Sequence, residues 1–187
     1  MSRFALCVGH SRRGDRGAVN TKGVSEHVFN LPLAERVCEL LEDAGHSCKI
    51  YSSYDADNYE SAMRWVSKEV GAWRADAAVE LHFNSASASA EGYEYLFWGS
   101  SQRSEKLAQC FALTHKQVFP KSKFRGLKPC DNLSRGAAFL RRTPCPAVLL
   151  EPFFGSNAQE TDLYSASLEQ LARVYADALC LWASNKS

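Results

Sequence analysis

Short apolar runs alternate with segments of helical periodicity along most of the chain. The runs that predict strands cover residues 4–8, 47–51, 77–83, 93–98 and 147–150. The segments in which apolar residues recur at three- and four-residue spacing predict helices, and they cover residues 25–44, 59–73, 105–119 and 164–182. This alternation is typical of an α/β protein, and we expect a three-layer αβα sandwich with a mostly parallel central sheet.

The first and last helical segments contain the clearest local signals. Gly45 stands where the first helix should stop, and Pro32 must kink that helix or mark a fresh start, because its ring clashes with the carbonyl four residues earlier. The last segment keeps the helical period from Tyr164 to Trp182 almost without error. We find no internal repeat and no low-complexity linker. Residues 1–187 are therefore expected to form one domain, which at this length buries roughly 70% of its unfolded surface.

Composition indicates which binding partners the protein could have and in which cell compartment it is made. A formal net charge of +1 gives no reason to expect a nucleic-acid partner. The seven cysteines are odd in number and form no CxxC pair, which favours reduced, buried thiols over a disulfide framework and indicates cytosolic synthesis. The N-terminal segment MSRFALCVGH is too short in apolar residues for a signal peptide, and no run approaches the roughly 20 apolar residues of a membrane span. We expect no membrane insertion.

One segment, 116–128, is locally basic and has no acidic residue. Charge runs are usually solvated faces, so an exposed loop is the favoured interpretation. The alternative is an anion-attracting rim beside an active site, which would raise encounter rates with a polyanionic substrate in a salt-dependent way.

Four residues with metal or acid–base chemistry stand at the end of an apolar run or on the first turn after one: His10, Glu26, His82 and Glu151. An α/β fold places its ligand sites at the carboxyl ends of its strands. Two imidazoles and a carboxylate can hold Zn²⁺ and leave its fourth position open for water, and a second carboxylate can move the proton of that water. The set indicates a metallohydrolase.

Taken singly, each of these residues also has a structural explanation. A histidine after a strand is in most proteins a core or capping residue, and Glu26 fits an ordinary first-turn glutamate favoured by the helix dipole. Glu151 is the hardest to explain in this way. It interrupts the apolar segment PAVLLEPFF, where a carboxylate is costly unless it is paired, lies near a metal or is functionally tuned.

The chain offers few competing ligands. His27 would point about 100° away from Glu26 around a helix, so the two residues cannot serve one metal. His46 and His115 are expected in a loop and on a helix surface, respectively. Glu80 would share the side of its strand with His82, which makes it the best substitute for Glu26, although we rank it behind.

Together these motifs resemble the zinc-dependent N-acetylmuramoyl-L-alanine amidases of the AmiC/CwlV type, the amidase-3 family, over nearly the whole chain. The family has a glycine-histidine pair after the first strand, a glutamate at the start of the first helix and a histidine-x-asparagine at a later strand end. The corresponding residues here are Gly9 with His10, Glu26, and His82 with Asn84.

Three further segments bear on the resemblance. Residues 140–143 match the family's leucine-arginine-x-threonine, and residues 146–151 match its proline-alanine-valine-leucine-x-glutamate. Residues 154–157 are similar to its closing phenylalanine-x-serine-asparagine. The chain departs from the family at residues 7–8, where cysteine and valine replace the usual aspartate-proline, so the first loop is expected to differ in shape.

The resemblance implies His10, Glu26 and His82 as ligands of one Zn²⁺ per chain and Glu151 as the catalytic carboxylate. The implied activity is hydrolysis of the amide bond between N-acetylmuramic acid and L-alanine in bacterial peptidoglycan. Glu151 would take a proton from the attacking water and return it to the leaving amine. Asn84 or Arg141 would help to orient the glycopeptide.

A small member without a signal peptide or a separate cell-wall-binding domain looks like a phage endolysin, made in the cytoplasm and acting on the wall after release. An exported bacterial enzyme is the less favoured origin, and we expect a monomer. Two other functions stay open. One is a zinc peptidase of carboxypeptidase type that cuts within the peptide stem, and the other is a non-enzymatic wall-binding module that has kept the fold.

Overall fold

The computed structural model describes residues 1–134 and 137–185. The strands are β1 (Arg3–Val8), β2 (Ser47–Tyr51), β3 (Ala77–Leu81), β4 (Tyr93–Trp98), β5 (Phe124–Cys130) and β6 (Ala147–Glu151). The helices are α1 (Glu26–Asp43), α2 (Tyr59–Ala72), α3 (Gln102–Val118), α4 (Ala137–Arg142), α5 (Ala158–Ala166) and α6 (Leu168–Ser184). None of the helices described is long and apolar enough to cross a membrane.

The strands form one six-stranded sheet in the order β2-β1-β3-β6-β4-β5. Neighbouring strands run parallel except at one place, where β4 pairs with β6 in the antiparallel sense. The strands β2, β1, β3 and β6 therefore end at the same edge of the sheet. The expected mostly parallel sheet is confirmed.

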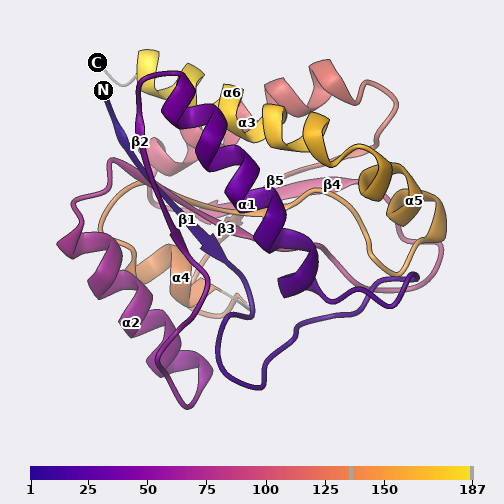
Figure 1. Cartoon of the computed structure of the whole chain (residues 1–187), viewed down its shortest axis with the longest axis horizontal. Helices are drawn as coiled ribbons and strands as arrows, with labels where there is room; N and C mark the ends of the chain where they lie inside the picture. Colours follow the sequence, from indigo (N-terminus) through magenta and orange to yellow (C-terminus); the bar gives the residue numbers. More distant parts are fainter. Residues whose placement is uncertain (135–136, 186–187) are drawn as a thin grey trace.

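Helices cover both faces of this sheet, which gives the three layers expected from the sequence. Figure 1 shows α1, α3 and α6 on one face and α2 and α4 on the other. Alternate residues of each central strand enter the two cores: in β1, Phe4 and Leu6 pack under α1 and α6, whereas Ala5 and Cys7 pack under α2. This alternation follows from the two-residue period of a strand. All seven cysteines are free, as expected.

Local signals set the ends of the helices. Ser25 caps α1 by accepting a hydrogen bond from the backbone N–H of Val28, and Asn58 and Ser61 form a reciprocal capping box at α2. Pro32 does not start a new helix, because α1 is continuous from Glu26 to Asp43. The carbonyl that loses its partner at Pro32 belongs to Val28, which is 60% exposed and can be hydrated.

Two predictions of secondary structure are wrong, and one helix was not predicted. The basic segment 116–128 is not a loop, since it contains the end of α3 and most of the edge strand β5. The segment 164–182 is two helices, because the backbone leaves the helical region at Ser167, whose φ is −118° and ψ is 29°. The short helix α4 was not expected at all. Smaller shifts occur at α3, which begins at Gln102, and at β3, which ends at Leu81 just before His82.

The expectation that His115 lies on a helix surface is also wrong. Its side chain is fully buried, stacks on the ring of Tyr93 at a centroid distance of 3.8 Å, and forms hydrogen bonds with the hydroxyls of Tyr95 and Tyr164. Burial lowers the pKa of His115 to about 3, so the imidazole is neutral. It therefore ties α3 to β4 and α5 as a structural group.

Candidate metal centre

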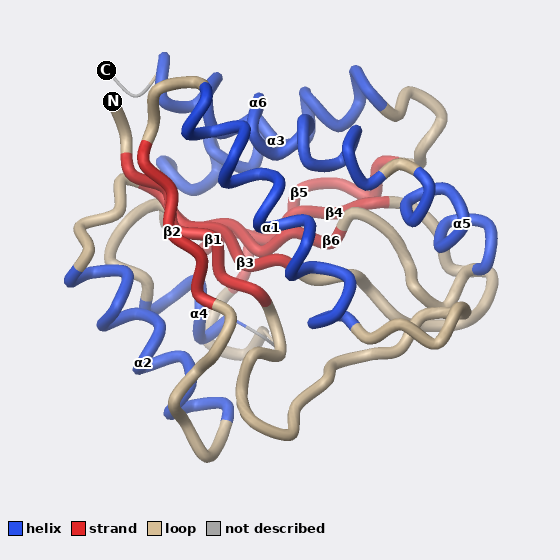
Figure 2. Tube along the Cα trace, viewed as in Figure 1, coloured by secondary structure: helices blue, strands red, loops and turns tan. Residues whose placement is uncertain are grey.

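The site lies at the edge of the sheet where β1, β3 and β6 end side by side. His82 follows β3 directly, His10 follows β1 after one glycine, and Glu151 is the last residue of β6. Backbone hydrogen bonds from Gly9 to Leu81 and from His82 to Leu150 hold these three strand ends in register. The loop after β1 returns to the same edge and delivers Glu26 as the first residue of α1. In Figure 2 this loop passes around the ends of β1 and β3.

Three of the predicted residues form a compact group of donors. His10, Glu26 and His82 each offer one ligand atom, and these atoms all lie within 4.8 Å of one another. Glu26 is in the middle: its Oε2 is 3.0 Å from Nδ1 of His82, and its Oε1 is 3.5 Å from Nε2 of His10. The two imidazole rings are nearly perpendicular, with centroids 5.0 Å apart. Two nitrogens and a carboxylate thus converge on one point.

Glu26 is held rigidly although it belongs to the first turn of a helix. Its side chain is almost completely buried, and its carboxylate accepts backbone hydrogen bonds from Ala18 at 2.8 Å and Phe83 at 3.2 Å. Burial alone would raise the pKa of Glu26, but the hydrogen bond with His82 and the charges of both histidines lower it below its usual value. Glu26 is therefore an ionised ligand candidate and not a solvated first-turn glutamate.

Each histidine has a second carboxylate on its other ring nitrogen. Asp15 Oδ1 lies 2.9 Å from Nδ1 of His10, and Glu80 Oε2 lies 3.5 Å from Nε2 of His82. Burial alone would lower the pKa of His82, but hydrogen bonding to Glu26 and Glu80 raises it well above its usual value. Both imidazoles thus have one nitrogen facing the donor group and one facing an outer carboxylate.

Two glycines leave the space in which the histidines sit. A Cβ on Gly9 would lie 2.3 Å from the imidazole of His82, and a Cβ on Gly17 would lie 2.5 Å from the imidazole of His10. Gly17 also has a positive φ of 67°. His10 itself has a φ of 57°, an uncommon left-handed conformation that histidine tolerates better than most residues. The backbone of the first loop is therefore shaped around the two rings.

Glu151 lies beside this group with one oxygen unused. Its Oε2 is buried and has no hydrogen-bond partner among the described residues. Burial raises the pKa of Glu151 to about 8, although the charge of His82 opposes the rise. The carboxylates of Glu26, Glu94 and Glu80 raise it further. A carboxyl group with this pKa can both accept and release a proton near neutral pH.

The two residues predicted to bind substrate have partners within the protein. Asn84 Nδ2 donates to Glu94 Oε1 at 2.9 Å, and Arg125 donates to Glu94 Oε2 at 2.9 Å. Glu94 lies directly opposite Glu151 in the β4–β6 pairing, so this network borders the site. Arg141 lies exposed on α4 and donates to Asn132 at 2.9 Å. The roles of Asn84 and Arg141 in substrate binding stay predictions.

Sequence reasoning missed Asp15 and Glu94, and it included Arg125 only in the basic segment 116–128, whose alternative interpretation was a rim beside an active site. Asp15 follows His10 by five residues within a glycine-containing loop, and that proximity was the available signal. Glu94 and Arg125 meet only because β4 and β5 pair. The rival ligands lie outside the donor group: His27 Nε2 is 3.2 Å from the carbonyl of Ser52. Glu80 contacts the donor group from outside and does not replace Glu26.

The donor group fits a zinc ion. Two histidines and one glutamate are a ligand set found in catalytic zinc sites, which keep a fourth position for water or substrate. Ionised Glu26 supplies negative charge at the centre, and the outer carboxylates can orient the imidazoles. The unpartnered Oε2 of Glu151 is the kind of orphaned buried atom that a reacting water or substrate would satisfy.

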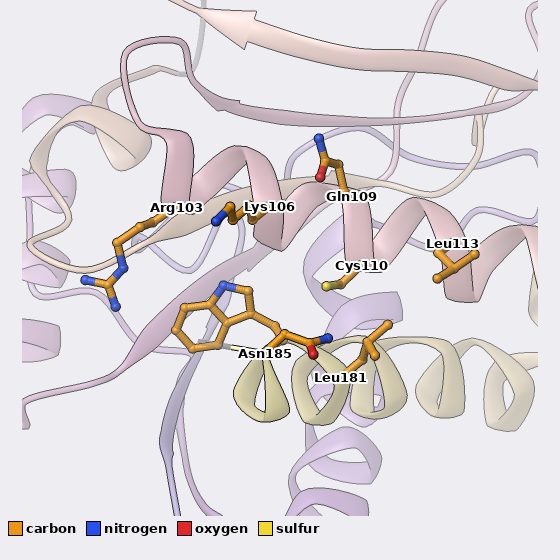
Figure 3. A pocket seen from close by; sticks show the side chains of 8 residues that line it. Arg103, Lys106, Gln109, Cys110, Leu113, Leu181 and Asn185 are labelled. Atoms are coloured by element: carbon orange, nitrogen blue, oxygen red, sulfur yellow. The ribbon is translucent and has the colours of Figure 1, made fainter. Parts of the chain in front are cut away.

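A groove of about 580 Å³ on another part of the molecule contains none of these residues. It lies between α3 and α6, and Figure 3 shows side chains from both helices projecting into it. Its Arg103 end is near the start of α3, which follows β4. Because β4 runs against β6, the end of β4 lies at the edge of the sheet opposite Glu151. This groove is therefore separate from the metal centre.

Comparisons with known proteins place this chain in a family. The sequence model of Amidase_3, N-acetylmuramoyl-L-alanine amidase, matches residues 5–180. The solved structure of the CwlD amidase from Clostridioides difficile in complex with the GerS lipoprotein has a TM-score of 0.87 and 23% identity, covering 99% of this chain and 100% of that one. A comparison with curated protein sequences gives no significant match.

Two further solved structures are similar over nearly their whole length. The catalytic domain of CwlV, an N-acetylmuramoyl-L-alanine amidase from Bacillus (Paenibacillus) polymyxa var. colistinus, has a TM-score of 0.81 and 24% identity, covering 98% of this chain and 99% of that one. The catalytic domain of the CD27L endolysin targeting Clostridia difficile has a TM-score of 0.82 and 22% identity, with 96% and 97% covered. At these identities the structures establish the fold, and the sequence model establishes the family. The chain belongs to the Amidase_3 family of N-acetylmuramoyl-L-alanine amidases.

Proposed function

We propose that this protein is a zinc-dependent amidase that cleaves the bond between N-acetylmuramic acid and L-alanine in bacterial peptidoglycan. The observation that carries the proposal is the convergence of His10, Glu26 and His82 beside a carboxyl group, Glu151, whose buried Oε2 has no partner among the described residues. Membership of the amidase family supports the choice of bond. One zinc ion per chain, held by the two histidines and Glu26, follows from the number of donors.

The proposed mechanism assigns a distinct task to each residue. A bound zinc ion would lower the pKa of water and polarise the amide carbonyl. Glu151 accepts a proton from the attacking water on its free Oε2 as the water adds to the carbonyl carbon. The same carboxyl group then donates that proton to the amine of L-alanine as the carbon–nitrogen bond breaks. Its raised pKa suits this return of the proton.

The products that the protein releases from purified sacculi show which bond it cuts. We expect intact peptide stems with a free L-alanine amine, identified by mass spectrometry of the released material. Release of single residues or shortened stems would instead support a zinc peptidase of carboxypeptidase type. Stoichiometric zinc without turnover on any peptidoglycan would support a non-enzymatic wall-binding module.

Variants separate the role of Glu151 from that of the metal. Glu151→Gln is expected to bind zinc as tightly as the wild type and to lose about 10²- to 10⁴-fold in kcat, the usual contribution of a general acid–base group. Glu39→Gln is the matched control. Glu39 is exposed on α1, about 20 Å along the helix from Glu26, and its loss should change neither quantity. Full activity in Glu151→Gln contradicts the proposed role.

Substrate orientation by Asn84 and Arg141 is part of the same proposal. Arg141 is exposed on α4 and is free to contact solvent or a ligand. Arg141→Ala is expected to raise KM and to leave zinc affinity unchanged. A KM equal to that of the wild type would remove Arg141 from the binding site.

We also propose that the enzyme acts on the wall after release from the cytoplasm, as a phage endolysin does. The seven free cysteines support synthesis in a reducing compartment. Expression in a Gram-negative host should leave cells intact until the inner membrane is permeabilised with chloroform, and lysis should then follow. Lysis without permeabilisation would favour an exported bacterial enzyme.

A further inference from the structure

Glu80 is a buried carboxylate in the middle of the sheet. It lies on β3, between Cys7 of β1 and Leu149 of β6, and its residue surface is 3% exposed. The neighbouring side chains on this face, among them Ala78 and Leu149, belong to the apolar core beneath α2 and α4. A carboxylate in such surroundings is costly unless it has a charged or hydrogen-bonding partner.

The partner recorded for Glu80 is the metal-centre histidine two residues further along the chain. Glu80 Oε2 lies 3.5 Å from Nε2 of His82. Among residues 1–134 and 137–185, Glu80 forms no other ion pair. The other nitrogen of the ring, Nδ1, faces Glu26 at 3.0 Å. Glu80 therefore approaches the imidazole from the side opposite to the donor group.

This arrangement decides which nitrogen of His82 can bind a cation. A neutral imidazole carries one proton, and the nitrogen without it provides the lone pair. Both nitrogens face a carboxylate, but a metal ion held by Glu26 and His10 would replace the proton on Nδ1, and the proton that remains on Nε2 would point at the acceptor Glu80. The lone pair is consequently on Nδ1, which faces Glu26 and His10.

His10 repeats the arrangement with a different carboxylate. Its Nδ1 lies 2.9 Å from Asp15 Oδ1, and its Nε2 faces Glu26 at 3.5 Å. The two histidines thus use opposite ring nitrogens toward Glu26, and each has a carboxylate behind the other nitrogen. Asp15 comes from a loop, whereas Glu80 comes from β3, an inner strand of the parallel part of the sheet. The strand fixes the position of Glu80 more firmly.

We propose that Glu80 is a positioning residue for the metal centre: it holds His82 in the form protonated on Nε2 and directs Nδ1 to the metal. This inference rests on the proposed zinc-dependent function, and it adds a residue that does not itself bind the ion. It also explains why the sheet retains a carboxylate among apolar side chains, since the stabilisation appears when the metal is bound.

Two substitutions divide the contribution of Glu80 into charge and hydrogen bond. Glu80→Gln removes the charge and keeps an oxygen that can accept from Nε2–H, whereas Glu80→Leu removes both at similar volume. We expect the Kd for zinc, measured by chelator competition, to rise about tenfold in Glu80→Gln and about 100-fold in Glu80→Leu. Glu39→Gln on the exposed face of α1 is the control and should bind zinc as the wild type does.

Nuclear magnetic resonance gives a readout that a merely structural residue would not move. Long-range ¹H–¹⁵N spectra of the wild type loaded with zinc should show His82 bound through Nδ1 and protonated on Nε2. In the Glu80→Leu protein loaded with zinc, the proton on Nε2 of His82 should exchange faster with solvent than in the wild type, because its acceptor is gone. Circular dichroism and thermal unfolding of the metal-free variants report whether the fold is kept, and the wild-type spectrum alone tests the assignment if Glu80→Leu fails to fold.

The outcomes separate this inference from the proposed function. Zinc bound through Nε2 of His82, or a Kd within twofold of the wild type in both variants, would overturn the role of Glu80. If the wild type nevertheless binds zinc and releases intact stems from sacculi, the proposed function stands. A wild-type protein that binds no zinc would overturn both.

Discussion

Replacing the carboxyl group of Glu151 should make the metal-free protein more stable at neutral pH. The change is Glu151→Gln, at the end of β6. Oε2 of Glu151 is buried without a hydrogen-bond partner in the part of the chain that the structure describes, and burial raises the pKa of this group to about 8 against the opposing charge of His82. The ionised form is therefore disfavoured in the folded state, and glutamine has no ionised form.

The sign and size of the effect follow from proton linkage. The pKa of Glu151 rises from 4.5 in the unfolded chain to about 8 in the folded one. The stabilisation from its bound proton is therefore complete below the lower value and is lost as the pH rises toward the higher one. At about 1.4 kcal/mol per pKa unit, the whole span of about 3.5 units corresponds to about 5 kcal/mol, of which about 2.5 kcal/mol is lost between about pH 5 and about pH 7. Glu151→Gln lacks this loss.

The assay is urea unfolding of both proteins with a chelator present, followed by the fluorescence of the four tryptophans. The free energy of unfolding of Glu151→Gln minus that of the wild type should grow by about 2.5 kcal/mol from about pH 5 to about pH 7. The difference for Glu39→Gln should stay flat. A Glu151→Gln difference that is constant, or that falls as the pH rises, would refute the reasoning. If it grows, the substitution that we expect to remove turnover also stabilises the fold, as expected for a residue kept for function.

Three further predictions concern groups around the site and in the core. Gly9→Ala should weaken zinc binding at least about tenfold, because its Cβ would lie 2.3 Å from the His82 ring. The control is Gly45→Ala, since Gly45 has a φ of 80° and open space around it. This control should lower the free energy of unfolding by about 1 kcal/mol and leave the Kd for zinc unchanged. Equal zinc affinity in Gly9→Ala would show that the ring is not confined by the backbone. The folded-state pKa of His115, about 3, lies below its ordinary 6.5, so stability should fall as the pH drops through that window. His115→Gln should flatten this acid limb in thermal unfolding, and an unchanged limb would assign it to other groups. Saturating zinc at about 100 times its Kd should stabilise the wild type by about 2.7 kcal/mol, measured by urea unfolding, and should not stabilise Glu26→Gln at the same concentration.

The local pattern of apolar residues was sufficient to predict the helices and strands that bury a regular face. The strand β1 and the helix α1 were expected within one or two residues of their bounds, because β1 is an unbroken apolar run and α1 keeps its apolar period. The edge strand β5 has no such period. Its sequence FRGLKPC is exposed or partly exposed until Cys130, and only pairing with β4 makes it a strand. α4 is too short for a periodic signal, since it has six residues.

The prediction that His115 lies on the surface was wrong for a different reason. A histidine with lysine beside it on α3 reads as a solvated position, but α3 packs against both the sheet and α6. The hydroxyls of Tyr95 and Tyr164, from elements 20 and 49 residues away, give the buried imidazole its hydrogen bonds. Polarity predicts exposure only when no buried partner is available, and such partners are set by tertiary packing.

The sequence by itself determined that His10, His82 and Glu151 would meet at one edge of the sheet, and it identified the family through the motifs around them. The physical reason is that adjacent parallel strands end together, so a residue's place at a strand end also fixes its place in space. Tertiary structure decided what these residues do to one another. It brought Glu26 between the two histidines, left Oε2 of Glu151 unpartnered, and set Glu80 behind His82. Those relations depend on which ring nitrogen faces which carboxylate across strands and loops distant in sequence, and no local pattern encodes them.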